Sequence, residues 1–184
     1  MIELMIALAV LSIIISVGLP RMSVFFKGNR MVVNANDLIA GLNIARSEAI
    51  KRNGRVSICK SANAGDASPS CTTAGGWDQG WFVFVEGKEV GNIFGTYTPS
   101  DGAILRINTG AEGANVTINA DSSGIANYVT FTSRGVPRLN NGASQSGVLR
   151  VCDERGLSNA RGVILNASGR VRTTKVAAKI GACP

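Results

Sequence analysis

The stretch IELMIALAVLSIIISVGLP, residues 2–20, decides the architecture of this 184-residue chain. Residues 4–19 contain no charged side chain, and Glu3 stands alone at the outer end of the run. As an α-helix the run measures about 24 Å, somewhat less than the roughly 30 Å of a bilayer's hydrocarbon core. A secretory signal peptide has a basic head and a small-residue cleavage site, and this stretch has neither. We therefore expect a retained helix that lipid or other helices cover.

Beyond Pro20 the pattern becomes that of an amphipathic helix. One apolar stripe follows helical steps of three and four residues: Met31, Ala35, Leu38, Leu42, Ala45 and Ala49. Gly54 is expected to end the helix. A single helix over residues 2–52, bent near residues 18–20, would be about 75 Å long. A domain of this size cannot bury all of it, so its first half must project.

The remainder reads as short β-strands separated by Gly, Asn and Ser. The candidate strands lie at residues 55–59, 81–85, 104–108, 115–119, 128–132, 148–152, 162–166 and 169–173. Trp77 and Trp81 are expected in the sheet core. The predicted class is α+β, with a long N-terminal hydrophobic helix packed on an antiparallel β-sheet domain. The expected division is a hydrophobic helix at 1–22, its amphipathic half at 23–53, and a β-rich domain at 54–184.

The four cysteines are Cys59, Cys71, Cys152 and Cys183, and they lack the close pairs of a zinc site. Behind a membrane-entry segment, an even count indicates an oxidising compartment and two disulfides. Three pairings are open. We favour Cys59–Cys71, which closes a Ser/Ala/Gly-rich loop, and Cys152–Cys183, which ties the C-terminus to a strand.

The net charge of +7 is concentrated in the C-terminal part of the chain. Residues 134–184 contain nine Lys or Arg against two Asp or Glu, and the rest of the chain is balanced. Within this region the candidate residues for DNA binding are Gly169, Arg170, Arg172, Lys175 and Lys179. On a strand, Arg170 and Arg172 would face the same side, which suits sequence-independent contact with DNA phosphates. The alternative is a solvated basic face without a ligand.

No feature of the sequence points to catalysis. Histidine is absent, which removes the commonest general base and metal ligand. The nucleophile-elbow, zincin, Walker A and C-x-x-C patterns are absent as well. We expect neither an enzyme nor a metal or cofactor site. A membrane-tethered enzyme is the remote alternative.

Glu3 is the one charge in the apolar run, and an unpaired carboxylate in a membrane costs about 2.5–3.5 kcal/mol by insertion scales. Arg21 is eighteen residues away, about 27 Å along a helix, and cannot neutralise it. A cation from another chain, such as a neighbour's amino terminus, would do so. Alternatively, Glu3 lies among lipid headgroups and has no role.

Several motifs resemble one family. Residues 2–20 are similar to the N-terminal helix of type IV pilins and type II secretion pseudopilins. The stretches LNIARSEAIKRN (42–53), GGWDQGWFVFVEG (75–87), VTFTSRGVP (129–137) and GVILNASGRVR (162–172) resemble the FimT/FimU minor pilins and the GspH pseudopilins. The resemblance covers nearly the whole chain and is weakest over residues 89–127.

The resemblance implies a minor pilin with a type IV pilin-like fold, anchored by a single pass in the bacterial inner membrane with a periplasmic C-terminal domain. Its partners would be other major and minor pilins. A prepilin peptidase would cut before the helix, the new amino terminus would be methylated, and Glu3 would pair with a neighbour's amine during assembly. In FimT-like competence pilins a similar Gly-Arg-x-Arg element is associated with DNA uptake in natural transformation. The alternative is a GspH-like pseudopilin of type II secretion.

The chain departs from the family at its start. The family's Gly-Phe-Thr before the helix is missing, and Met1 stands where Leu is usual. We expect the natural prepilin to begin upstream of Met1.

Overall fold

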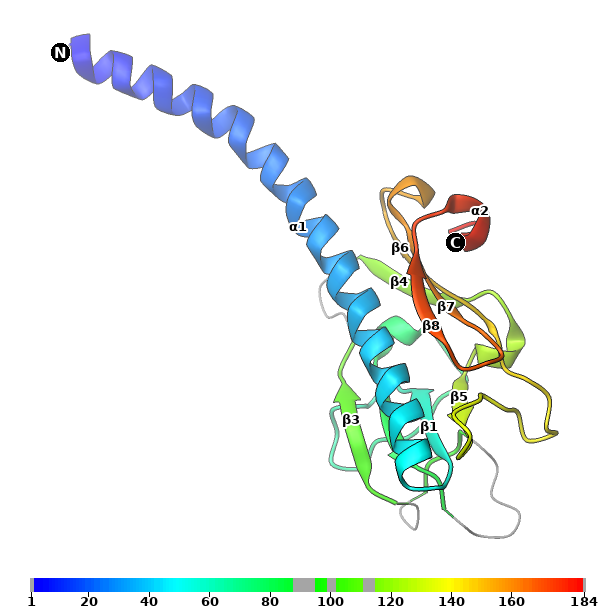
Figure 1. The fold of residues 1–184 in the computed structure, drawn as a ribbon. Coiled ribbons are helices and arrows are strands. Elements are labelled where there is room, and N and C mark those ends of the chain that lie inside the picture. Colours follow the sequence, from blue (N-terminus) through cyan, green and yellow to red (C-terminus); the bar gives the residue numbers. More distant parts are fainter. Residues whose placement is uncertain (1, 88–94, 99–101, 111–114, 184) are drawn as a thin grey trace.

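The computed structural model describes residues 2–87, 95–98, 102–110 and 115–183, without the side chains of residues 17–24. Its first element, α1 (Ile2–Lys51), is one uninterrupted helix. The N-terminal half of α1 projects from the molecule, and its C-terminal half lies along the β-strands (Figure 1). Figure 1 also shows that α1 curves between these halves. The prediction of one long, half-projecting helix is confirmed.

The C-terminal half of α1 is held by the apolar stripe read from the sequence. Its six residues are at most 1% exposed: Met31, Ala35, Leu38, Leu42, Ala45 and Ala49. Asn29, Asn36 and Asn43, on the other faces, are exposed. The helical spacing of apolar residues therefore predicted correctly which side of α1 packs on the domain.

The end of α1 differs slightly from expectation. Asn53, and not Gly54, adopts the left-handed conformation, with φ of 47°. The amide of Gly54 donates to the carbonyl of Ala49 (3.1 Å), and the amide of Asn53 donates to that of Ile50 (3.2 Å). This is the Schellman arrangement, and asparagine serves in it because its short polar side chain tolerates positive φ.

All eight expected strands form, but they divide between two antiparallel sheets where we expected one. The first sheet has the order β3-β2-β1-β5 and contains β1 (Val56–Lys60), β2 (Trp81–Val85), β3 (Ile104–Asn108) and β5 (Tyr128–Phe131). The second has the order β4-β6-β7-β8 and contains β4 (Val116–Ala120), β6 (Gly147–Asp153), β7 (Arg161–Leu165) and β8 (Val171–Thr174). Alternation of apolar and polar residues identifies a strand but not the strand with which it pairs. The division of the eight strands between two sheets could therefore not be predicted from the sequence.

Four short helices complete the described structure. They are η1 (Trp77–Gln79), η2 (Ser123–Ile125), η3 (Leu157–Asn159) and α2 (Ala177–Ile180). The sequence patterns predicted none of them, because three or four residues are too few to show a helical period.

The hydrophobic core lies between the α1 stripe and the inner faces of both sheets. Trp77 and Trp81 are buried in it, as predicted. The Trp81 ring comes so close to α1 that a Cβ added to Gly41 would lie 2.6 Å from two ring carbons. Gly41 therefore lets the helix backbone approach the β2 tryptophan directly.

Two disulfides each join a strand of the β domain to a later segment of the chain. Cys59 pairs with Cys71, with Cα atoms 5.6 Å apart, and Cys152 pairs with Cys183, at 5.9 Å. These are the pairings that the sequence favoured among the three. The second disulfide ties the segment after α2 to β6, so the C-terminal residues stay beside the second sheet.

The turn between β7 and β8 packs on α1 through glycine. Gly169 has φ of +79°, and a Cβ added there would lie 2.1 Å from the carbonyl oxygen of Gly135 and 3.2 Å from Nε of Arg46. The guanidinium of Arg46 also donates to the Ser168 carbonyl at 3.3 Å. The conformation and the packing thus both require glycine at position 169.

We expect Gly41→Ala to lower the free energy of unfolding by about 1–2 kcal/mol, because displacing the Trp81 ring outweighs the gain in helix propensity. The matched control is Gly28→Ala on the same helix, where an added Cβ meets nothing within 4 Å. That control should raise stability by about 0.5–1 kcal/mol. Denaturant unfolding of the full chain in detergent measures both. Equal stability of the two variants would contradict the close contact.

We expect Gly169→Ala to destabilise the protein by about 2–4 kcal/mol, the sum of left-handed strain and the overlap with Gly135. Gly156→Ala is the control, since Gly156 has φ of +77° but an added Cβ meets nothing. It should show only the strain, about 1–2 kcal/mol. The same unfolding assay measures both variants. If Gly169→Ala lowers the free energy of unfolding no more than Gly156→Ala does, the close contact between Gly169 and Gly135 is disproved.

Candidate functional site

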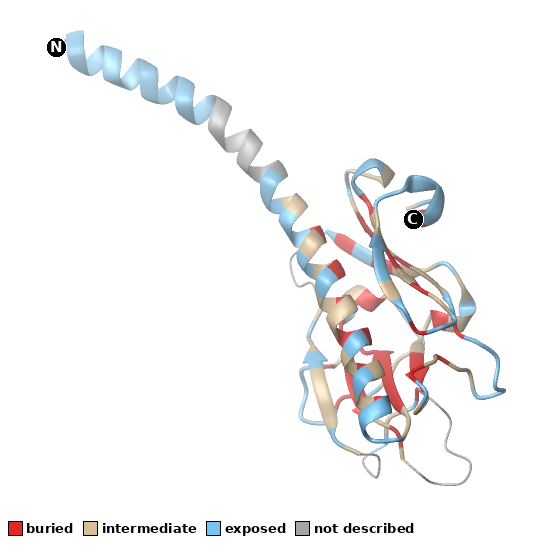
Figure 2. Ribbon diagram, viewed as in Figure 1, coloured by how far each residue is buried: buried red, intermediate tan, exposed pale blue. Residues whose placement is uncertain are grey.

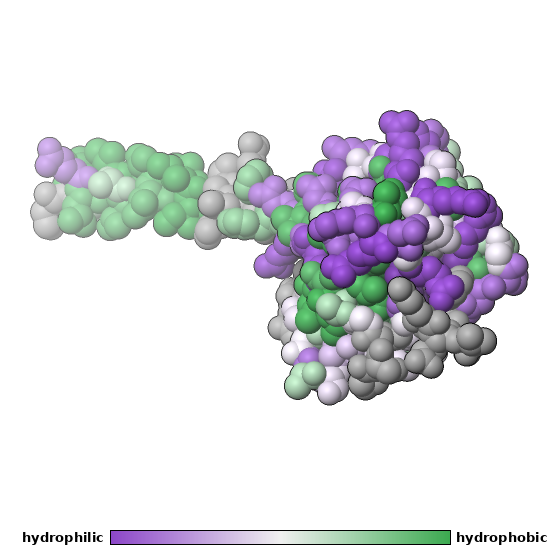
Figure 3. Space-filling model, turned by 60° about the horizontal axis from the view of Figure 1, so that its bottom comes forward, coloured by the Kyte–Doolittle hydropathy of each residue, from purple (hydrophilic) through white to green (hydrophobic). Residues whose placement is uncertain are grey.

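The projecting part of α1 presents an apolar segment, which we define as residues 2–16. Ten large hydrophobic side chains in it are 47–74% exposed: Ile2, Leu4, Met5, Ile6, Leu8, Val10, Leu11, Ile13, Ile14 and Ile15. Figure 2 shows the segment exposed on every side, and Figure 3 shows its apolar surface set apart from the more polar domain. In the described part of the chain, no helix is both long enough and apolar enough to count as a membrane span.

The two serines of the apolar segment satisfy their own hydroxyl groups. Ser12 Oγ donates to the carbonyl of Ala9 at 2.8 Å, and Ser16 Oγ donates to that of Ile13 at 2.9 Å. A hydroxyl bonded to its own helix can enter an apolar environment without leaving its donor unpaired. The segment is therefore compatible with complete removal from water, except at Glu3.

Glu3 lies exposed in the first turn of α1, where a negative charge interacts favourably with the helix dipole. Among the described residues none forms an ion pair with it, and the helix carries it away from the β domain (Figure 1). A cation for Glu3 must therefore come from outside the described part of the chain.

Of the candidate DNA-binding residues, Arg170 and Arg172 share an outward-facing surface of the second sheet. Arg172 lies in β8, the edge strand of that sheet, and Arg170 directly precedes β8, with its carbonyl accepting from the amide of Asn166 at 3.0 Å; both side chains are exposed. Val171, between them, packs against the core, so alternation places the arginines on the opposite face. Gly169 is buried in the β7–β8 turn, where it packs toward Gly135 and Arg46. We call Arg170 and Arg172 the β8 arginine pair.

Lys175 and Lys179 are not beside this pair. Lys175 lies past the end of β8 and lines a hollow together with Gly28 and Met31 of α1, on the opposite side of the sheet. Lys179 is exposed on α2, which packs on the outer face through Ile180. The four cations that are close in the sequence are thus distributed over at least two surfaces, because successive residues of a strand face opposite ways.

The hollow that contains Lys175 was not foreseen. Its volume is about 140 Å³, and we call it the neck hollow, since it lies where α1 leaves the domain. Its lining residues are Gly28, Met31, Arg155, Ser158, Asn159, Ala160, Arg161 and Lys175. Arg155 and Arg161 precede the run of basic residues at 170–179, and the pairing of β7 with β8, in which Gly162 is opposite Thr174, places Arg161 near Lys175.

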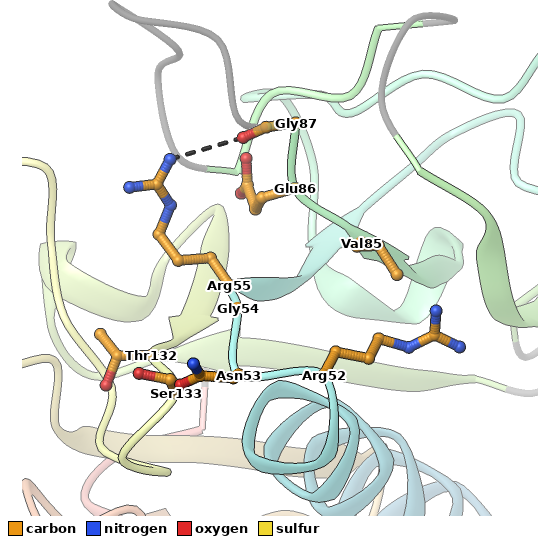
Figure 4. Close-up of a pocket in the computed structure, with 9 residues that line it drawn as sticks. All are labelled: Arg52, Asn53, Gly54, Arg55, Val85, Glu86, Gly87, Thr132 and Ser133. Atoms are coloured by element: carbon orange, nitrogen blue, oxygen red, sulfur yellow. Dashed lines mark hydrogen bonds between the residues drawn. The ribbon is translucent and has the colours of Figure 1, made fainter.

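A larger cavity, of about 650 Å³, lies beside the C-terminal end of α1. Figure 4 shows Arg55 and Glu86 among its lining residues, with the Arg55 guanidinium donating to the Gly87 carbonyl at 3.4 Å. The buried Glu86 carboxylate already accepts hydrogen bonds from Ser57 Oγ and from the amide of Gly95 (2.7 Å). The Glu86 carboxylate thus links Ser57 of β1 to the backbone at Gly95.

Lys60 is a second buried charge that the sequence did not reveal. Its ammonium donates to the carbonyls of Thr73 (3.0 Å) and Gly75 (2.7 Å), and so anchors the segment that follows Cys71. Burial lowers the pKa of Lys60, and the charge of Asp78 opposes this effect. Among the described residues, no group of three or more Cys, Asp or Glu side chains is arranged to hold a metal ion.

Comparison with solved structures agrees with this architecture. The type IV minor pilin FimU of Pseudomonas aeruginosa PAO1 matches in one crystal form with a TM-score of 0.58 and 22% identity, over 87% of this chain and 99% of that one. A second crystal form of FimU matches with a TM-score of 0.54 and 20% identity, over 82% and 97% of the two chains. At this identity the likeness establishes the fold. No curated protein matches the sequence.

The family comparison covers most of the chain. Residues 34–169 match the model of the family described as type II transport protein GspH. This range includes α1 from Asn34 onward, the whole first sheet and strands β4, β6 and β7 of the second, and it ends immediately before Arg170. The chain belongs to the GspH family.

Proposed function

We propose that this protein is a minor pilin, a low-copy filament subunit that takes part in assembly or priming of a type IV pilus. The observation that supports this proposal most strongly is the apolar segment of α1, in which ten large hydrophobic side chains are exposed. Covering their exposed parts would contribute on the order of 10 kcal/mol, comparable to the stability of a whole domain. Monomeric proteins rarely leave so large an apolar surface in water.

Two environments can cover this segment in turn. Before assembly, the inner membrane would hold residues 2–16 with the β domain on the periplasmic side. In the filament, the same surface would pack against α1 helices of neighbouring major and minor pilins. Cleavage by a prepilin peptidase and methylation of the new amino terminus, which the family resemblance implies, belong to this proposal.

Glu3 would then serve assembly, by pairing with the amino terminus of a neighbouring subunit. The absence of an ion-pair partner among the described residues supports this role. In an apolar filament core such a pair would also fix the register between adjacent helices, because an uncompensated carboxylate there is costly.

We expect Glu3→Gln to abolish or strongly reduce incorporation into filaments, because the amide keeps the size of the side chain but loses its charge. Quantitative immunoblotting of sheared filaments and of the membrane fraction measures incorporation. Asp66→Asn, which likewise replaces an exposed carboxylate by its amide on the β domain, is the control and should leave incorporation unchanged. Wild-type incorporation of the Glu3 variant would disprove the pairing.

The second candidate is a minor pseudopilin of a type II secretion system, which the description of the matched family favours. Both candidates use the apolar segment in the same way. They differ in the assembly to which the subunit belongs, a type IV pilus or a type II secretion system. A strain without the gene, complemented by the wild-type gene, separates them. Loss of twitching or transformation with normal secretion supports the pilus, and the reverse result supports secretion.

A further part of the proposal is that the β8 arginine pair binds double-stranded DNA during natural transformation. Arg170 and Arg172 are exposed on one face of an edge strand, and guanidinium groups there can contact successive phosphates. Such contacts carry no base readout, so binding would be independent of sequence.

We expect the double substitution Arg170→Gln and Arg172→Gln to weaken duplex binding and to make the log–log salt slope shallower by about 2. Gel shifts over a salt series measure both quantities. Arg161→Gln with Lys175→Gln removes the same charge from the neck hollow and is the matched control. If the two double variants lose affinity equally, binding is a matter of net charge and the assigned surface is wrong.

A further inference from the structure

The end of the domain from which α1 projects carries basic side chains from several segments of the chain. They are Lys27 and Arg30 on α1, Arg155 and Arg161 on either side of η3, Lys175 after β8 and Lys179 on α2. These segments meet in space: Lys27 contacts Glu154, and the neck hollow joins α1 to η3, β7 and the end of β8. Basic groups therefore gather around residues 27–31 of α1, where the helix leaves the domain.

The two described acidic groups at this end, Asp153 and Glu154, are already engaged. Asp153 binds Arg155, with Nε 2.8 Å from Oδ2 and the Arg155 amide 3.0 Å from Oδ1. Glu154 binds Lys27 and accepts a hydrogen bond from the Asn115 side chain at 3.1 Å. The hydrogen bond from Lys27 is the main reason why the pKa of Glu154 is lowered, so this carboxylate stays ionised and compensates Lys27.

Among the described residues, two cations that line the neck hollow have no counter-charge. No described residue forms an ion pair with the Arg161 guanidinium or the Lys175 ammonium. Arg155 lines the same hollow with its guanidinium oriented by Asp153, and Ser158 and Asn159 add a hydroxyl and an amide. Two cations with no described counter-charge, a fixed guanidinium and the Ser158 hydroxyl, whose oxygen accepts from the Asn159 amide at 3.2 Å, are groups that can bind one phosphate oxyanion.

The volume and the open side of the hollow are consistent with such a ligand. At about 140 Å³ it can hold several water molecules, and therefore one tetrahedral oxyanion. On the α1 side the wall is Gly28, where an added Cβ would meet nothing within 4 Å. The missing side chain leaves this wall of the hollow open.

The position of the hollow indicates the source of the phosphate. Gly28 is nine residues beyond the end of the uncharged run, about 14 Å along α1. With that run in the hydrocarbon core, the headgroup layer would occupy roughly the next 5–8 Å. With α1 along the membrane normal, the hollow lies about 6–9 Å beyond the headgroup layer, within a Debye length of the lipid charge. A tilt of α1 brings the hollow into contact with the lipid phosphates.

We propose that the neck hollow binds the phosphate of an anionic phospholipid headgroup through Arg155, Arg161 and Lys175. The inference rests on the proposed function in one respect, the placement of the apolar segment in a bilayer. The site would set the β domain on the membrane surface while the subunit awaits assembly. Duplex DNA fits the hollow less well, because the hollow is a small recess at the base of a membrane-facing helix.

The test uses the full-length protein in micelles of an uncharged detergent, titrated with fluorescent phosphatidylglycerol. We expect saturable binding that weakens with salt. Arg161→Gln with Lys175→Gln should reduce the affinity about 30-fold, since each basic side chain near an anionic surface contributes about a factor of five. Phosphatidylcholine and inorganic phosphate should each bind at least about tenfold more weakly than phosphatidylglycerol.

Gly28→Glu is a second variant that removes no existing contact and places a carboxylate in the hollow. It should weaken lipid binding, and Gly28→Ala should not. Arg170→Gln with Arg172→Gln, the charge-matched control on the opposite face, should bind lipid like the wild type. Unchanged melting temperatures and an intact Cys152–Cys183 disulfide establish that each variant is folded.

Four results would overturn the proposal. They are unchanged lipid binding in the hollow variants, an equal loss in the β8 arginine variant, inorganic phosphate binding as tightly as phosphatidylglycerol, and loss of duplex DNA binding in the hollow variants. None of these results bears on filament incorporation, which the Glu3 variant measures separately. Failure of this inference is thus distinguishable from failure of the proposed function.

Discussion

The structure depends on the contact between the C-terminal half of α1 and the inner faces of the two sheets. The apolar stripe from Met31 to Ala49 is buried there, and Gly41 brings the helix backbone against Trp81. Because the helix continues unbroken to Ile2, this contact also fixes the direction in which the apolar segment leaves the domain. One helix thus forms part of the core at one end and exposes an apolar segment at the other.

The charge of the molecule is organised by the second sheet. Strand alternation sends the β8 arginine pair outward, while Lys175 turns toward α1 and meets Arg155 and Arg161. A sequence that looks like one basic tail therefore forms two basic surfaces. The proposed ligands of both contain phosphate, but one surface is an open strand edge and the other a recess beside the projecting helix.

The elements that the sequence predicted well are those that short-range periodicity defines. The buried side of α1, the eight strands and the burial of Trp77 and Trp81 follow from spacing and residue type. The division into two sheets, the left-handed Asn53 and the buried Lys60 did not follow. They depend on contacts between residues distant in the chain, or on a choice between adjacent turn residues of similar propensity.

The sequence alone determined that this protein has a helix too apolar and too long for its own domain to cover, because hydrophobicity and helical rise are local properties. It also determined the lone carboxylate at the tip of that helix. Only the tertiary structure decided which cations act together, since strand pairing brings Arg161 to Lys175 and separates Lys175 from Arg172. Such groupings arise from the register and packing of distant segments, which no local pattern encodes.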